Sequence, residues 1–164
     1  MKLNIIVAMC ENKGIGYENK LPWKFSTDMK YFSRLTKGNN NNAVIMGRKT
    51  HESIGKILPN RYNIILSKSI HKNSNNISFF NNIQDILTFC SEKKFQEVWI
   101  IGGETIYKQF LDLKIVNEVY ITEIIKSYNC DTFFPLLSKD FTLIDCNYEI
   151  ENNTKLCFKK YVNL

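Results

Sequence analysis

Short apolar segments recur along the chain, and they constrain its fold more than any other feature of the sequence. A strand that faces water on one side alternates apolar and polar residues, whereas a strand covered on both sides is apolar throughout. The segments here are continuous and rich in β-branched and aromatic residues. They occupy residues 3–9, 43–46, 63–66, 77–80 and 98–101. The pattern predicts strands of a parallel sheet with helices on both faces.

Helical patterns separate these segments. One stripe, formed by Met29, Phe32 and Leu35, predicts a helix over residues 28–36. The same spacing recurs in two later segments, residues 83–90 and 106–111. This alternation of strands and helices indicates βαβ units.

The pattern changes after residue 117, where helical spacing stops. The remaining strand-like segments are residues 118–125, 141–146 and 155–162. Strands without a helix between them pair as antiparallel neighbours, so we expect an antiparallel hairpin at the end of the sheet. The sequence predicts an α/β fold: a single three-layer domain over residues 1–164, with about eight mostly parallel strands and about four helices.

The composition indicates which classes of ligand the protein can bind and in which compartment it is expected. The chain has 22 Lys and Arg against 16 Asp and Glu, a net charge of +6 that favours acidic ligands such as phosphates, carboxylates or nucleic acid. The five cysteines form no Cys-x-x-Cys pair and no histidine lies near one, so no metal site is expected. No apolar segment approaches the ~18 residues of a membrane span. We expect a cytoplasmic protein with reduced thiols.

The segment that ends in Gly102 and Gly103 runs directly into a helical pattern. Two glycines allow a ligand to approach the backbone, and the free N–H groups at a helix N-terminus bind anions. Many helices begin at Gly-Gly for packing reasons alone, so this turn is compatible with either interpretation.

A second strand-to-helix turn supplies Arg48, Lys49 and the hydroxyl of Thr50, and Lys68 follows the strand predicted at residues 63–66. Open α/β sheets bind ligands at the carboxyl ends of their strands. The cations at these ends favour a dinucleotide with an additional 2′-phosphate, as in NADP. A G-x-G-x-x-G sequence is absent, so the site is not a conventional Rossmann site.

A single carboxylate, Asp28, lies in an apolar and aromatic segment. Ser26 or Thr27 is predicted to cap the helix, which places Asp28 in its first turn. An Asp there can simply complement the helix dipole. With Trp23, Met29 and Phe32 around it, the carboxylate can instead pair with an amidine-like ligand edge in a water-poor pocket. The spacing leaves both interpretations open.

Taken together, the motifs resemble those of dihydrofolate reductase. They cover essentially the whole chain in order: residues 15–16, 21–23, Asp28, 44–50, 52–55, 58–59, Arg61, 63–67, 101–103, Tyr107, 120–122 and 131–135. The resemblance implies reduction of 7,8-dihydrofolate to 5,6,7,8-tetrahydrofolate. Hydride passes from nicotinamide C4 of NADPH to pterin C6, and a proton is added at N5.

The resemblance also implies roles for individual residues. Asp28, supported by Thr122, holds the pterin N3 and 2-amino edge as an electrostatic partner, while water donates the proton. Arg61 holds the glutamate α-carboxylate through its bidentate fork. Residues 15–23 form the loop that closes over the nicotinamide, in which Leu21 and Trp23 complete the catalytic group.

Most of the implied contacts are to substrate or cofactor. The implied substrate-binding residues are Ile6, Val7, Ala8, Asp28, Met29, Phe32, Ile54, Leu58, Arg61, Ile101, Tyr107 and Thr122. The implied cofactor-binding residues are Ala8, Ile15, Gly16, Gly47, Arg48, Lys49, Thr50, Leu66, Ser67, Lys68, Ile101, Gly102, Gly103 and Tyr107.

Three residues depart from the family's pattern. His51 stands where Trp is common, Cys130 where Gly is usual, and Glu104 where small residues are frequent. We expect His51 to be partly buried and structural, Cys130 to stiffen a loop linked to closure, and Glu104 to place negative charge near the pyrophosphate. These departures affect rates and cofactor affinity more than identity.

Two other functions fit parts of the sequence. A pyrimidine reductase of riboflavin synthesis shares the fold and NADPH, but it does not need residues 21–23, Asp28 and Arg61 in combination. A basic binder of single-stranded nucleic acid would interleave aromatic residues with Lys on exposed strands, whereas the aromatics here fall in core-like stripes. We expect a monomer that binds dihydrofolate and antifolates, without a membrane or nucleic-acid partner.

Overall fold

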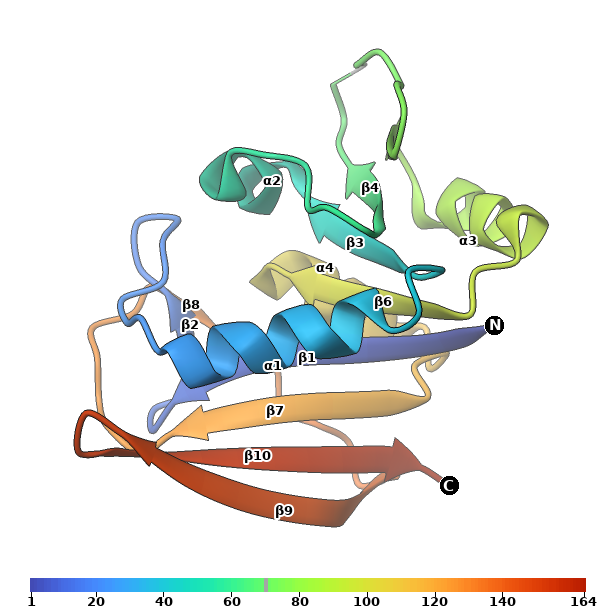
Figure 1. Ribbon diagram of the computed structural model, residues 1–164. Helices are drawn as coiled ribbons and strands as arrows, with labels where there is room; N and C mark the ends of the chain where they lie inside the picture. The colour runs from blue at the N-terminus through green and yellow to red at the C-terminus, as the bar shows by residue number, and fades with distance from the viewer. Residues whose placement is uncertain (70) are drawn as a thin grey trace.

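An eight-stranded sheet forms the centre of the computed structural model, which describes residues 1–69 and 71–164 (Figure 1). The strand order is β5-β4-β3-β6-β1-β7-β10-β9. These strands are β1 (Lys2–Cys10), β3 (Ala43–Gly47), β4 (Tyr62–Leu66), β5 (Ile77–Phe80), β6 (Glu97–Gly102), β7 (Glu118–Ile124), β9 (Phe141–Glu151) and β10 (Thr154–Asn163). The first six in this order are parallel, and β10 is antiparallel to both of its neighbours.

Helices cover both faces of this sheet, as the continuous apolar segments predicted. They are α1 (Ser26–Lys37), α2 (Arg48–Ile54), α3 (Ile83–Lys93) and α4 (Glu104–Asp112). Apolar residues of α1 and α2 pack against one face, and those of α3 and α4 pack against the other. The predicted three-layer α/β fold with a C-terminal antiparallel hairpin is confirmed.

A small second sheet was not predicted from the sequence. Strand β2 (Gly14–Gly16) pairs with β8 (Thr132–Phe133), two segments more than 100 residues apart in the chain. Each is too short to show a periodic pattern. The pairing holds part of the segment that the sequence assigns to a closing loop.

The predicted cap of α1 was wrong. The residue before the helix is Phe25, which makes no side-chain capping bond, and the helix begins at Ser26. The N–H groups of Ser26 and Thr27 instead donate to the carboxylate of Glu151, at 2.9 Å each. Glu151, 124 positions from Thr27 in the chain, therefore caps the helix in place of the hydroxyl of Ser26 or Thr27 that the sequence predicted.

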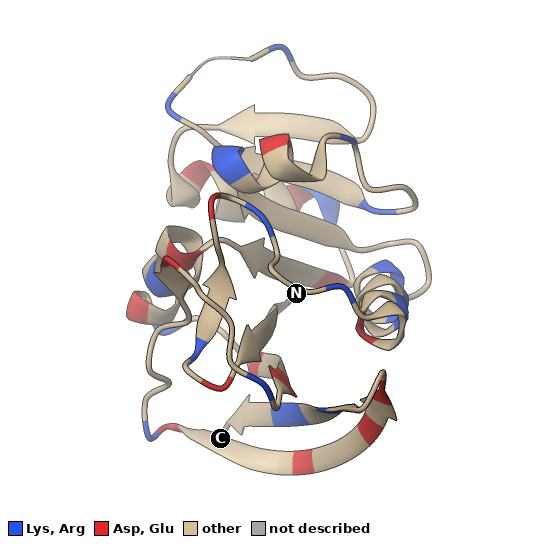
Figure 2. Ribbon diagram, turned by 90° about the vertical axis from the view of Figure 1, so that its left-hand side faces the viewer, with Lys and Arg blue, Asp and Glu red and all other residues tan. Residues whose placement is uncertain are grey.

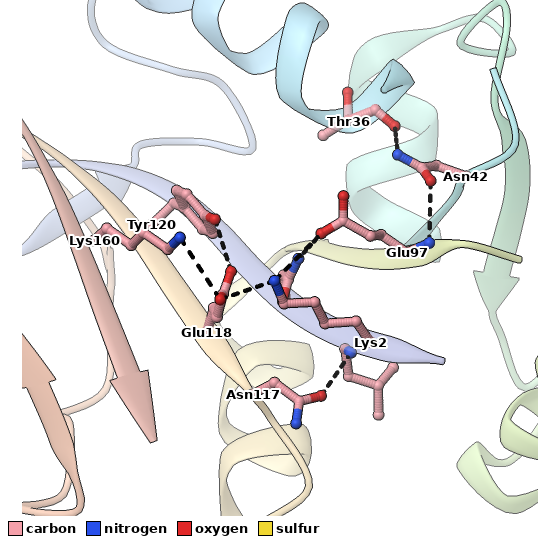
Figure 3. A network of polar contacts seen from close by, with 10 residues as sticks. Lys2, Thr36, Asn42, Glu97, Asn117, Glu118, Tyr120 and Lys160 are labelled. Atoms are coloured by element: carbon pink, nitrogen blue, oxygen red, sulfur yellow. Dashed lines mark hydrogen bonds and ion pairs between the residues drawn. The ribbon is translucent and has the colours of Figure 1, made fainter. Parts of the chain in front are cut away.

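Polar side chains tie together the amino ends of the central strands (Figure 3). Glu118 at the start of β7 accepts from the Tyr120 hydroxyl at 2.7 Å, and it forms ion pairs with Lys2 at 2.8 Å and Lys160 at 3.7 Å. Burial acts to raise the pKa of Glu118, but the hydrogen bonds from Lys2 and Tyr120 and the two ammonium charges outweigh it and hold this pKa below its ordinary value. Glu118 thus joins β1, β7 and β10 at the amino ends of the parallel strands.

Glu118→Gln is expected to lower the free energy of unfolding at pH 7 by about 1–3 kcal/mol, because Lys2 and Lys160 lose their common partner. A carboxylate with a lowered folded-state pKa stabilises the fold above its ordinary pKa of 4.5, and this contribution disappears as pH falls through the lower folded value. Urea unfolding of both proteins across this range should show the difference shrinking in acid. A difference independent of pH would show that the charge is not its cause.

Candidate active site

A cleft of about 1880 Å³ opens at the carboxyl ends of the parallel strands. Its floor includes Ala8 of β1, Gly47 of β3, Leu66 of β4 and Ile101 of β6. Single ligand pockets commonly measure about 300–1,000 Å³, so the cleft has room for two ligands side by side. Its position is the one that open α/β sheets favour for ligands.

The cleft brings together most of the residues singled out in the sequence. Those that line it are Ile6, Val7, Ala8, Ile15, Gly16, Leu21, Asp28, Met29, Phe32, Gly47, Arg48, Lys49, Thr50, Ile54, Leu58, Arg61, Leu66, Ser67, Lys68, Ile101, Gly103 and Tyr107. Trp23, Gly102 and Thr122 do not line it. Trp23 is buried in a separate cluster with Phe25 and Phe158, and Thr122 is buried within β7.

Asp28 lies in the first turn of α1, partly buried at the cleft wall. Burial raises the pKa of its carboxyl above the ordinary value, the Thr122 side chain counteracts this rise, and the negative charge of Glu151 adds to it. Met29 and Phe32 of the same helix line the cleft beside it. A carboxylate in such surroundings interacts strongly with a ligand edge that carries positive charge or N–H donors.

Arg61 is held rigidly at another part of the wall. It is 6% exposed, its Nε donates to the Pro59 carbonyl at 2.9 Å, and its Nη1 donates to the Thr36 hydroxyl at 3.0 Å. Burial lowers the pKa of the guanidinium, which nevertheless stays protonated at neutral pH. For Nη2 and the second N–H of Nη1, no acceptor is found in the part of the chain that the structure describes, so these two nitrogens can bind an anion in the cleft.

The two strand-to-helix turns lie side by side. An added Cβ on Gly47 would stand 3.1 Å from Cγ1 of Ile106 in α4, and one on Gly103 would stand 3.6 Å from the Thr50 hydroxyl. The helices α2 and α4 therefore begin next to each other, and a side chain at Gly47 would crowd Ile106. Arg48, beside it, pairs with Glu52 at 2.8 Å on the exposed side of α2.

The segment between β1 and α1 is held at the cleft by hydrogen bonds to its backbone. The Asp131 N–H donates to the Gly16 carbonyl at 2.9 Å, and the Glu18 N–H donates to the Asp131 carboxylate at 3.0 Å. The Ser53 hydroxyl of α2 donates to the Asn19 carbonyl at 2.6 Å. The segment thus spans from β8 on one side to α2 on the other.

The three departures from the family's pattern have distinct surroundings. Cys130 packs against Gly14 of β2, and its sulfur lies 3.9 Å from that of Cys10. It therefore fills the space next to the end of β1 and the start of β2. The Glu104 carboxylate accepts from the Phe133 N–H at 2.7 Å, which ties α4 to β8. The predicted partial burial of His51 is confirmed, and its ring lies 6.0 Å from that of Phe79.

Sequence reasoning missed several polar residues of the cleft, including Asn19, Ser53, Lys37 and Lys56. A signal for Lys37 was present, because it shares a face of α1 with Met29 at a spacing of eight residues. Lys56 follows the end of α2, where only the tertiary structure shows that it faces the cleft. Tyr107 also lines the cleft, and its hydroxyl donates to the Ile6 carbonyl at 2.8 Å.

A parallel sheet with a large cleft at its carboxyl edge, one carboxylate in the apolar wall and cations at neighbouring strand ends is typical of nucleotide-dependent α/β enzymes. Residues 2–163 match the family model described as dihydrofolate reductase. The chain therefore belongs to the dihydrofolate reductase family, and its activity is the reduction of dihydrofolate.

Relatives from animals and bacteria agree with this assignment. The chain is 36% identical over 156 residues to the dihydrofolate reductase of Aedes albopictus, with 87% of this chain and 84% of the relative covered. It is 39% identical over 140 residues to that of Staphylococcus haemolyticus, with 85% and 80% covered. It is 33% identical over 182 aligned positions to that of Heliothis virescens, with 100% and 98% covered.

Proposed function

We propose that this enzyme binds dihydrofolate with its pterin beside Asp28 and its glutamate at Arg61, and that its cofactor is NADPH. The observation that carries the proposal is the joint presence of a partly buried carboxylate and a rigid, buried guanidinium in one apolar-walled cleft. A pyrimidine reductase on the same fold has no need for both groups.

The chemistry of Asp28 follows from its surroundings. The N3 and 2-amino groups of a pterin form an edge of two donors that matches the two oxygens of a carboxylate. Protonation at N5 places positive charge on the pterin, and a carboxylate in a low-dielectric wall stabilises that charge. Asp28 thus acts as an electrostatic partner, the incoming proton is donated by water, and Thr122 supports the carboxylate from β7.

The chemistry of Arg61 follows from its fixed guanidinium. Its bonds to Pro59 and Thr36 hold the plane before any ligand binds, so little entropy is lost when a carboxylate is gripped. Ile54 and Leu58 provide an apolar wall for the benzoyl group between the pterin and this carboxylate.

The opposite part of the cleft fits NADPH. Gly47 and Gly103 let the starts of α2 and α4 approach each other, and the N–H groups of α4 there favour a phosphate. Arg48, Lys49 and Lys68 offer cations for the phosphates, including the 2′-phosphate. When bound, the cofactor supplies the hydride that passes from nicotinamide C4 to pterin C6. Leu21, on the segment above the cleft, helps to exclude water there.

We propose further that residues 1–164 act as a single catalytic domain, monomeric and cytoplasmic, which antifolates also bind. All five cysteines are free, which agrees with a reducing compartment. No helix in the described part of the chain is long and apolar enough to cross a membrane. Lys and Arg are interspersed with Asp and Glu over helices, strands and loops in Figure 2, which supports a solvated surface over a nucleic-acid footprint.

The proposal is tested by the dihydrofolate-dependent loss of NADPH absorbance with purified protein. We expect turnover that prefers NADPH to NADH and stops when a diaminopyrimidine antifolate is added. An equal rate with NADH would contradict the assignment of Arg48, Lys49 and Lys68 to the 2′-phosphate. Folded protein that binds NADPH without reducing dihydrofolate would favour the pyrimidine reductase.

Asp28→Asn is expected to lower turnover at pH 7 by on the order of 100-fold to 1000-fold, as the loss of an electrostatic group at a reacting centre does. Steady-state kinetics measure this loss, and NADPH affinity, followed by fluorescence, should stay unchanged because Asp28 lies away from the phosphate-binding turns. A variant with nearly the rate of the wild type would refute the role given to Asp28.

Arg61→Lys is expected to raise the KM for dihydrofolate roughly tenfold, about 1.4 kcal/mol, with little change in kcat, because an ammonium cannot form the bidentate contact. The bonds to Pro59 and Thr36 are also weakened, so thermal unfolding of the variant should be measured alongside. An unchanged KM in a folded variant would contradict the pairing of Arg61 with the substrate carboxylate.

A further inference from the structure

The C-terminal hairpin reaches the helix that carries Asp28. Glu151, the last residue of β9, accepts hydrogen bonds from the N–H groups of Ser26 and Thr27 at 2.9 Å each and from the Ser26 hydroxyl at 3.3 Å. Asp28 is the next residue along the chain. A side chain from the far edge of the sheet therefore binds the turn in which Asp28 lies.

This contact replaces a cap that α1 lacks. The first N–H groups of a helix have no partner within it, and Phe25 offers no side-chain oxygen to them. A carboxylate at this end satisfies two donors and also complements the helix dipole. The bonds from Thr27 and Ser26 hold the pKa of Glu151 at about 2, so Glu151 is charged throughout the pH range in which Asp28 titrates.

The strands that deliver Glu151 also support the rest of this region. Glu151 pairs with Thr154 across the hairpin turn, and Asn152 and Asn153 in the turn both have positive φ, a conformation that Asn tolerates well. On β10, Phe158 pairs with Thr122 of β7, and its ring lies 4.7 Å from that of Tyr31 on α1. The Thr122 hydroxyl and the Glu151 carboxylate thus come from β7 and β9, the two strands that flank β10.

We propose that Glu151 is a positioning residue for catalysis: it fixes the first turn of α1 and adds a negative charge close to Asp28. The proposal rests on the role of Asp28 proposed above. Glu151 itself does not line the cleft, so it acts through the residues that do.

Other groups also act electrostatically on this part of α1. Thr122 of β7 interacts with the Asp28 carboxyl directly. Arg34 of α1 and Asp145 of β9 act on Tyr31, whose pKa burial raises to about 12, so that Tyr31 stays neutral near pH 7. Of these groups, Glu151 alone combines a permanent negative charge with bonds to the residues directly before Asp28.

The test is a titration of the Asp28 carboxyl by carbon-13 NMR, with its signal assigned from Asp28→Asn. Glu151→Gln keeps an oxygen for one N–H bond and removes the charge. We expect the pKa of Asp28 to fall in this variant, because its carboxylate is no longer repelled, and the pH profile of turnover to move to lower pH. Measurement at about 0.15 M salt, where the screening length is roughly 8 Å, restricts the effect to charges close to Asp28.

Two further variants separate this effect from others. Glu149→Gln removes an equal charge from an exposed position on the same strand and should leave the titration of Asp28 unchanged. Glu151→Asp keeps the charge and should restore most of the wild-type titration.

The proposal is overturned if Glu151→Gln lowers the melting temperature while Asp28 titrates as in the wild type, since Glu151 would then be structural only. It is also overturned if Glu149→Gln shifts the titration equally. Full activity of Asp28→Asn would instead refute the role of Asp28, and the titration shift would still show whether Glu151 acts on it.

Discussion

Burial of the central strands on both faces is the constraint on which the rest of the molecule depends. Ile5, Ile45, Ile64 and Ile100 are completely inaccessible to water, and a charged group in their place would have no partner. Charged groups are thereby confined to the ends of these strands. Because these strands are parallel, their carboxyl ends meet along one edge, and the cleft forms there.

Local patterns predicted most of the fold and most of the cleft. Apolar segments identify buried strands directly, and the Gly-Gly turn identifies the start of α4, because both signals lie within a few residues. Contacts between distant segments were beyond such reasoning. The pairing of β2 with β8 and the cap that Glu151 provides depend on how residues more than 100 positions apart meet, and no short window of sequence records it.

The same distinction applies to Arg61. The resemblance indicated its role in substrate binding, but only the structure shows that its guanidinium is held rigidly. Its partner Thr36 donates in turn to the Phe32 carbonyl, and the Thr36 carbonyl accepts from Asn42 at 3.1 Å. Asn42 also accepts from the Glu97 N–H, which reaches the network at the opposite edge of the sheet. A continuous set of hydrogen bonds therefore connects the wall of the cleft to the amino ends of the strands.

The ion pair between Lys2 and Glu118 also fixes where the ends of the chain lie. Lys2 begins β1 at the edge away from the cleft, and Val162 near the other end pairs with Glu118 itself. Figure 1 shows both termini on the same side of the molecule. Affinity tags, fluorescent fusions or tethers to a solid support can consequently be attached at either terminus, and the immobilised enzyme would present its open cleft to solution.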